Sequence, residues 1–286
     1  MSATVGDAID AVAERFEDAG LVFGHGFDSA WDEAVALVLH VTGLPDDLAV
    51  LDTAVHDTAR RRIDELAAER CDSRRPLAHL IGRCRFAGHD FLIEPGIVVP
   101  RSPIGALIRA GFRPWLRSPP ARILDLCCGS GCIGIAAALA FPDAELALVD
   151  VDPQAVELTR RNVALHGLGA RTRVYLGDLY DPLPAAERWD LILSNPPYVD
   201  APDMAALPAE YRHEPVAGLA GGADGLDVVA RILAGLPTRL APDGLLVCEV
   251  GASVPALLRR YPGMPFLWPD LPEGGEGVFL LWAGDV

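Results

Sequence analysis

From residue 121 onward, short apolar runs alternate with turns and with segments long enough to form helices. Strands are predicted for the apolar runs at residues 122–126, 145–149, 173–176, 191–194 and 245–250, and helices at 153–166 and 226–236. This alternation is typical of an α/β protein with a doubly wound, mostly parallel sheet, which binds ligands at the carboxyl ends of its strands. We therefore expect the functional residues directly after the strands.

The segment before this region has a different periodicity. Residues 1–84 carry apolar side chains at helical spacing and predict a small helical domain. Residues 85–103 alternate apolar with polar or small side chains around Glu94, Pro95 and Gly96, which predicts a β-hairpin linker. The α/β domain is then expected to span residues 104–286.

Charge and composition narrow the function classes. The chain has 24 basic and 40 acidic side chains, a net charge of −16, which disfavours binding to duplex nucleic acid and favours a basic protein partner. The longest apolar run, residues 132–141, is about half the ~20 residues that a membrane helix needs. No signal peptide is visible, so a cytoplasmic protein is expected. The six cysteines have no spacing typical of zinc, so no metal site is predicted.

Asp125 lies at the end of the first predicted strand, and Cys127, Gly129 and Gly131 follow that strand. A glycine turn between a strand and a helix lets backbone amides approach a ligand. The spacing D-x-x-x-G-x-G differs from the G-x-G-x-x-G of dinucleotide-binding proteins. A carboxylate here attracts a cationic amino group and repels a pyrophosphate.

Two more strand ends carry carboxylates. Asp150 ends the second strand and can accept hydrogen bonds from ribose hydroxyls, although a strand-end aspartate can also cap the following helix. Asp178 follows a third strand and is placed to bond an adenine amino group. In this order, the three carboxylates predict a binding site for S-adenosylmethionine. Its predicted lining is Asp125, Cys127, Gly129, Gly131, Asp150, Asp178 and Asn195.

The reaction is indicated by the turn Asn195-Pro196-Pro197-Tyr198, which follows another strand. Two prolines stiffen the turn and remove two backbone donors. The side-chain oxygen of Asn195 and the carbonyl of Pro196 are then two acceptors that can hold both hydrogens of a planar NH2 group, with Tyr198 as a stacking face. Asn195, Pro196 and Tyr198 are therefore the predicted catalytic residues.

These motifs resemble the HemK/PrmC family of protein-(glutamine-N5) methyltransferases over roughly residues 76–286. The resemblance includes Arg75–Gly82, the VPRSPI segment at residues 99–104 and the Asn-Pro-Pro-Tyr turn. VPRSPI and residues 203–215 resemble the PrmB branch, which methylates a glutamine of a large-subunit ribosomal protein.

The resemblance implies a class I (Rossmann-like) methyltransferase with a seven-stranded sheet. Residues 104–286 would be the S-adenosylmethionine-dependent domain, and residues 1–84 would recognise a basic ribosomal protein. The implied substrate-binding residues are Asn195, Pro196, Pro197, Tyr198, Arg101 and Glu214, where the last two either contact the substrate or order a loop.

Three alternatives remain open at this point. A glutamine methyltransferase of peptide chain release factors is disfavoured by VPRSPI. A DNA adenine N6-methyltransferase is disfavoured by the net charge of −16 and by the lack of a basic target-recognition region. A catalytically silent cofactor-binding protein is disfavoured because Asp125, Asp150 and the Asn195-Pro196 pair are intact.

Overall fold

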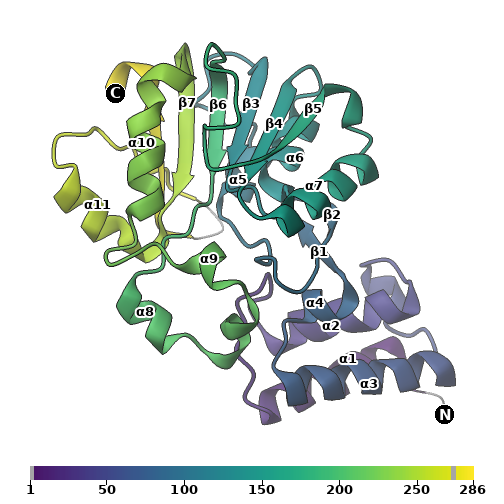
Figure 1. Cartoon of the computed structure of the whole chain (residues 1–286). Coiled ribbons are helices and arrows are strands. Elements are labelled where there is room, and N and C mark those ends of the chain that lie inside the picture. The colour runs from purple at the N-terminus through teal and green to yellow at the C-terminus, as the bar shows by residue number, and fades with distance from the viewer. Residues whose placement is uncertain (1–2, 272–274) are drawn as a thin grey trace. The chain divides into compact units, whose positions relative to one another are not determined.

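The chain forms two compact units in a computed structural model that describes residues 3–271 and 275–286 (Figure 1). The first unit comprises the described residues up to Cys84 together with Pro208–His213. The second comprises Arg85–Leu207 and the described residues from Glu214 onward. None of the helices in these described ranges is long and apolar enough to cross a membrane.

Helices build the first unit. They are α1 (Val5–Asp18), α2 (Ala30–Thr42), α3 (Asp57–Ser73) and α4 (Leu77–Ile81), with the 3-10 turns η1 (Leu48–Val50) and η3 (Ala209–His213). One apolar face of each of α1, α2 and α3 is buried in a common core, as the helical spacing of the sequence predicted.

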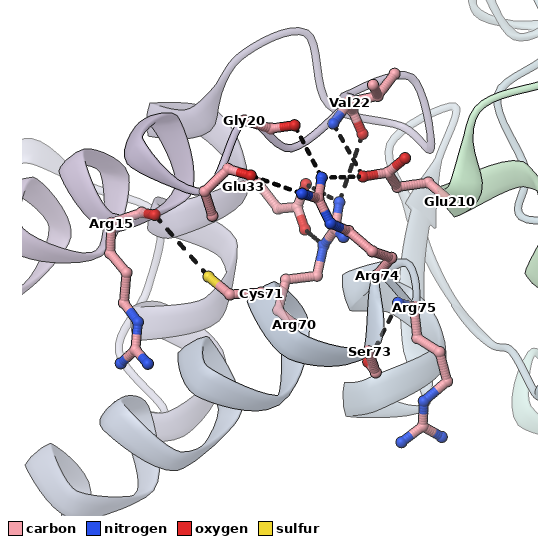
Figure 2. A network of polar contacts seen from close by, with 11 residues as sticks. Arg15, Gly20, Val22, Glu33, Arg70, Cys71, Ser73, Arg74, Arg75 and Glu210 are labelled. Atoms are coloured by element: carbon pink, nitrogen blue, oxygen red, sulfur yellow. Dashed lines mark hydrogen bonds and ion pairs between the residues drawn. The ribbon is translucent and has the colours of Figure 1, made fainter.

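A buried ion pair joins α2 to α3 (Figure 2). The Nε atom of Arg70 donates to Oε1 of Glu33 at 2.5 Å, and the two side chains are 1% and 3% exposed. Opposite charges inside an apolar core are tolerated only when each satisfies the other. Neither charge can therefore be removed alone without leaving its partner buried and unpaired.

The two strands β1 (Arg83–Phe86) and β2 (His89–Leu92) form a separate two-stranded sheet. The hairpin therefore turns at residues 87–88, and the prediction of a turn around Glu94, Pro95 and Gly96 is wrong. Residues 93–103 contain no strand. Prolines recur along this stretch and cannot donate the hydrogen bonds of a strand ladder.

A six-stranded sheet forms the centre of the second unit. Its strands are β3 (Arg122–Leu126), β4 (Glu145–Asp150), β5 (Thr172–Leu176), β6 (Trp189–Ser194), β7 (Leu240–Glu249) and β8 (Val278–Trp282). Their order is β5-β4-β3-β6-β7-β8, and only the β7–β8 pair is antiparallel. Figure 1 shows β7, β6, β3, β4 and β5 side by side. The doubly wound, mostly parallel α/β fold is thereby confirmed.

Helices cover both faces of this sheet. One face carries α5 (Ile104–Arg109), α6 (Cys132–Ala140) and α7 (Pro153–Leu165), and the other carries α10 (Asp227–Arg239) and α11 (Val254–Arg260). The connection from β6 to α10 contains α8 (Ala201–Ala206), η3 and α9 (Val216–Leu219). Three further 3-10 turns are η2 (Gly169–Arg171), η4 (Gly251–Ser253) and η5 (Ala283–Asp285). Both faces of the strands are thus buried, which explains their nearly continuous apolar sequences.

The prediction of seven strands is wrong for the described residues. Among the described residues beyond α11, the chain pairs with β8 only at Leu267, which exchanges two backbone hydrogen bonds with Leu280. Pro265 and Pro269 flank this bridge. Because proline cannot donate to a neighbouring strand, the pairing does not extend. In place of the predicted seventh strand, the described residues form one isolated β-bridge beside β8.

The buried pair in the helical unit yields a stability prediction. Arg70→Met leaves the Glu33 carboxylate buried without its partner, so the opening free energy of α1–α3 should fall by about 3–5 kcal/mol. Native-state hydrogen exchange measures this free energy for the unit. The double variant Glu33→Leu, Arg70→Met should recover most of the loss. Glu65→Ala, which removes an exposed pair with Arg62, should cost less than about 1 kcal/mol. Unchanged exchange in Arg70→Met would contradict the role of the pair.

Candidate active site

The carboxyl ends of the parallel strands bring the predicted residues to one edge of the sheet. Leu126, the last residue of β3, pairs with the residues of β4 and β6 that directly precede Asp150 and Asn195. Asp150, Cys127 and Asn195 therefore lie in this order across the neighbouring ends of β4, β3 and β6. This is the edge at which open α/β sheets bind ligands.

Asp125 lies fully buried beneath this edge. Its Oδ2 atom accepts a 2.8 Å hydrogen bond from the Gly134 N–H in α6, whereas Oδ1 has no hydrogen-bond partner among the described residues. Burial raises the pKa of this carboxyl to about 8; the Gly134 hydrogen bond opposes the shift and the charge of Asp150 reinforces it. A buried carboxyl oxygen that lacks a partner is suited to a cationic ligand group.

Close packing of α6 against the sheet requires glycine at position 134. A Cβ atom there would lie 2.7 Å from Leu148 Cδ2 and 2.8 Å from Asp125 Cβ. Any side chain would push the helix away from the strand and lengthen the bond between the Gly134 N–H and Asp125. The glycine thus allows the start of α6 to reach the buried carboxyl group.

Asp150 holds the backbone of the glycine turn between β3 and α6. Its Oδ2 accepts from the Gly129 N–H at 2.8 Å, and its Oδ1 accepts from the Asp152 N–H at 2.9 Å. Burial raises the pKa of Asp150, and these two hydrogen bonds oppose the rise. Each carboxylate oxygen can accept a further hydrogen bond, so Asp150 retains acceptors for ribose hydroxyls. The residue that caps α7 is Asp152, which accepts from the Gln154 N–H.

The turn itself is strained at Cys127, whose φ of 57° is uncommon for a residue with a side chain. Such strain costs of order 1–3 kcal/mol and gathers at ligand sites. A Cβ atom on Gly129 would meet no atom within 4 Å, so the space beside the turn is open. Burial and the charges of Asp150 and Asp125 raise the pKa of the Cys127 thiol, which therefore stays protonated.

Asp178 follows β5 and pairs with Arg231 of α10 at 2.7 Å. The two side chains are 46% and 54% exposed, and exposed pairs contribute only about 0–1 kcal/mol. The pairing therefore leaves the Asp178 carboxylate accessible to a ligand.

The Asn-Pro-Pro-Tyr turn begins where β6 ends. The hydroxyl of Ser194 donates to the Leu126 carbonyl at 2.9 Å, which ties the ends of β6 and β3 together. Pro196 is buried, whereas Asn195 and Pro197 are partly exposed. The Asn195 side chain has no hydrogen-bond partner in the part of the chain that the structure describes. Its amide oxygen is therefore available to a ligand.

Tyr198 is fixed in place at the end of this turn. Its hydroxyl donates to Oε1 of Glu249 at 2.7 Å, and its carbonyl accepts from the Ser253 hydroxyl at 2.9 Å. The next residue, Val199, forms two backbone hydrogen bonds with residues 219–221. These contacts determine the direction of the Tyr198 side chain.

Glu249 is a buried acidic residue that the sequence analysis missed. It ends β7, where its Oε2 accepts from the Ser102 hydroxyl at 2.6 Å while Oε1 accepts from Tyr198. Burial raises the pKa of Glu249, opposed by these two hydrogen bonds and by the charge of Arg101. The signal was present, because Glu249 is an acidic residue at the carboxyl end of an apolar strand, as Asp125 and Asp150 are.

Arg101 and Glu214 are brought together by the structure. Arg101 binds Glu214 through two hydrogen bonds of 2.6 and 2.8 Å, and the Val99 N–H donates to the same carboxylate at 2.8 Å. A bidentate arginine–carboxylate pair fixes geometry as well as charge. The pair therefore orders the chain at Glu214. A direct contact of either residue with a substrate stays a prediction.

The residues at this edge fit the expected cofactor. The incompletely bonded carboxyl of Asp125 suits its cationic amino acid portion, and the spare acceptors of Asp150 suit its ribose. The open space beside Gly129 gives it room.

Comparisons with known proteins identify the family. A family model for the methyltransferase small domain matches residues 114–209. A protein of Bordetella pertussis named ribosomal protein uL3 glutamine methyltransferase is 45% identical over 282 residues, which cover 97% of this chain and 94% of the relative. A protein of the same name from Burkholderia pseudomallei is 41% identical over 293 residues and covers 99% and 95%, respectively. The chain belongs to the ribosomal protein uL3 glutamine methyltransferase family.

Membership in this family confirms the predicted enzyme class and cofactor: the chain is an S-adenosylmethionine-dependent methyltransferase. The predicted resemblance to the HemK/PrmC family and its PrmB branch is confirmed as well. The hMettl16 catalytic domain, solved in complex with the MAT2A 3′UTR hairpin 6, has the same fold. It matches with a TM-score of 0.53 at 17% identity and covers 86% of this chain and 91% of that chain.

The raised pKa of Asp125 predicts proton release on cofactor binding. Below about pH 8 the buried carboxyl keeps its proton, and a cationic group beside it favours the ionised form. S-adenosylmethionine binding near neutral pH should therefore release a proton, and the affinity should rise with pH until Asp125 is ionised. Calorimetry in buffers of different ionisation enthalpy measures this. Asp125→Asn, the matched control, should lose that proton release; equal release in both proteins would contradict the assignment.

Proposed function

We propose that this protein transfers the methyl group of S-adenosylmethionine to the side-chain amide nitrogen of a glutamine in ribosomal protein uL3. One observation carries the choice of a planar nitrogen acceptor. The Asn195 side chain has no hydrogen-bond partner among the described residues, and Asn195 directly precedes Pro196 in a turn at the sheet edge that also holds Asp150. The identity of the relatives supports glutamine and uL3.

The chemical difficulty is the weak nucleophilicity of an amide nitrogen, whose lone pair is delocalised into the carbonyl. S-adenosylmethionine would supply a methyl group on a cationic sulfur: as the N–CH3 bond forms, the S–CH3 bond breaks with its electron pair left on sulfur, and one amide proton passes to water. Asn195 and Pro196 accept the two N–H bonds of the amide and thereby orient its nitrogen. Orientation of this kind contributes several kcal/mol to rate enhancement. The same two oxygens stabilise the positive charge that develops on nitrogen.

Cofactor binding is assigned to the strand-end carboxylates. Asp150 accepts hydrogen bonds from the ribose, Asp125 faces the cationic amino acid portion, and Asp178 binds the adenine amino group. Cys127, Gly129 and Gly131 line the same turn with backbone atoms.

The remaining residues of the Asn-Pro-Pro-Tyr turn shape the substrate site. Pro197 stiffens the turn, and Tyr198 forms a wall against which the glutamine side chain packs. The bond from Tyr198 to Glu249 holds that wall in place. Arg101 and Glu214 act on the substrate indirectly, because their ion pair orders the chain at Glu214 in the connection that follows the turn.

The charge of the chain supports a basic partner. A net charge of −16 attracts a basic ribosomal protein and accelerates its association at low salt. We assign recognition of this partner to the helical unit, and we infer a cytoplasmic location, where ribosomal proteins are made. The same charge opposes duplex DNA as a substrate.

A methyl-transfer assay with labelled S-adenosylmethionine tests the proposal. The wild-type protein is incubated separately with uL3, with peptide chain release factors and with DNA, and the labelled residue is identified by mass spectrometry. Label should enter a glutamine of uL3. Label in release factors or DNA, with none in uL3, would contradict the proposed substrate.

Variants of Asn195 test the mechanism. Asn195→Ala removes one acceptor, so methyl transfer should fall by about 10²-fold or more while S-adenosylmethionine affinity stays nearly constant. Asn195→Asp keeps an acceptor of the same size but loses the NH2 donor and adds a charge that is costly to desolvate. Its rate should lie between those of Asn195→Ala and the wild type. An alanine variant with the wild-type rate would show that the turn is only structural.

A further inference from the structure

The segment Pro208–His213 has an unusual place in the fold. It lies between the Asn-Pro-Pro-Tyr turn and α10, yet it belongs to the compact unit of the N-terminal helices, whereas Leu207 and Glu214 on either side belong to the other unit. The chain therefore leaves the α/β unit after α8 and returns to it six residues later. Something in the segment must hold it to the helices.

Glu210 provides that attachment (Figure 2). Its side chain is 1% exposed, and its Oε1 atom accepts hydrogen bonds of 3.1 Å from both the Val22 N–H and Nη1 of Arg74. Ionised carboxylates are rarely buried unless donors satisfy them. The Glu210 carboxylate is therefore a buried, specifically bound group and not a solvent-exposed acidic side chain.

The helical unit presents Arg74 for this contact. Arg74 ends α3 in a left-handed conformation with φ 61°, and its guanidinium also donates to the carbonyls of Ala19 and Gly20. The neighbouring buried arginine, Arg70, is already paired with Glu33. Arg74 is thus held by backbone carbonyls, and Glu210 supplies its carboxylate partner.

Charge and ring contacts support the attachment. Burial alone would raise the pKa of Glu210, but the hydrogen bonds from Val22 and Arg74 and the charge of Arg70 together lower it, so the carboxylate is held ionised. The next residue, Tyr211, packs its ring against buried His25, with ring centroids 4.3 Å apart.

A second anchor holds the same stretch of chain in the α/β unit. Four residues after Glu210, Glu214 is bound by Arg101 and by the Val99 N–H. The two ends of the connection between β6 and α10 are joined next to the Asn-Pro-Pro-Tyr turn, where Val199 forms backbone hydrogen bonds with residues 219–221. The loop that starts at Tyr198 is thus fixed at its base and by one buried carboxylate in each unit.

We propose that Glu210 is a positioning residue for methyl transfer. Its attachment to the helical unit holds the loop that follows Asn195–Tyr198 in the conformation that methyl transfer requires. This inference rests on the proposed function in one respect: the rate is measured with uL3 as the substrate. Loss of the attachment should release residues 199–213 without disturbing the strand-end carboxylates that bind S-adenosylmethionine.

Glu210→Gln tests this with little change in volume. The variant loses the charge that pairs with Arg74, so the rate of methyl transfer to uL3 under saturating substrate should fall about tenfold, the scale of losing one charged hydrogen bond. Backbone amides in residues 199–213 should exchange with solvent faster, while amides of α1–α3 and the affinity for S-adenosylmethionine should stay unchanged. Glu210→Ala should show the same pattern more strongly.

The matched control is Glu69→Gln. Glu69 pairs with Arg75 at the surface of the same helical unit, one turn from Arg74, and does not touch the segment. It should leave rate and exchange at wild-type values. Unchanged exchange of residues 199–213 in Glu210→Gln and Glu210→Ala would overturn the attachment, and a wild-type rate despite faster exchange would overturn the positioning role. If wild-type protein does not methylate uL3, the proposed function fails, whereas the exchange measurement still decides whether Glu210 anchors the segment.

Discussion

Two carboxyl groups at neighbouring strand ends, buried Asp125 and partly buried Asp150, organise the proposed active site. Asp125 accepts the N–H of Gly134 in α6, and Asp150 accepts the N–H of Gly129 in the turn before that helix. The first bond joins β3 to α6 itself, and the second joins β4 to the turn that connects β3 to α6. Burial raises both pKa values, so these side chains add a destabilising desolvation term to the protein alone. A cationic, hydroxyl-bearing cofactor removes part of that cost, which is why the groups suit a binding site.

The parallel sheet also positions the proposed catalytic residues of the Asn-Pro-Pro-Tyr turn. The Ser194 hydroxyl binds the last carbonyl of β3, so the start of the Asn-Pro-Pro-Tyr turn is set by the strand that carries Asp125. The end of β7 also positions the turn, because Glu249 at this strand end accepts a hydrogen bond from the hydroxyl of Tyr198. The proposed cofactor and acceptor sites are therefore neighbouring parts of one sheet edge.

The sequence predicted the residues whose position follows from a strand end. Asp125, Asp150 and Asn195 could be placed at one edge because parallel strands share a direction. Glu249 obeys the same rule and was overlooked. Glu210 could not be found in this way, since its role depends on a contact with Arg74 that is 136 positions away in sequence. The pairing of Arg101 with Glu214 is equally non-local, and the missing seventh strand depends on prolines that interrupt pairing with β8.

The most direct test of this account is a crystal structure of the protein with S-adenosylhomocysteine and a glutamine-containing segment of uL3. The account predicts that the glutamine NH2 group lies within hydrogen-bond distance of both the Asn195 side-chain oxygen and the Pro196 carbonyl, with the ribose on Asp150. A glutamine bound away from Asn195, or a ribose that does not touch Asp150, would contradict the claim that the strand ends form the catalytic site.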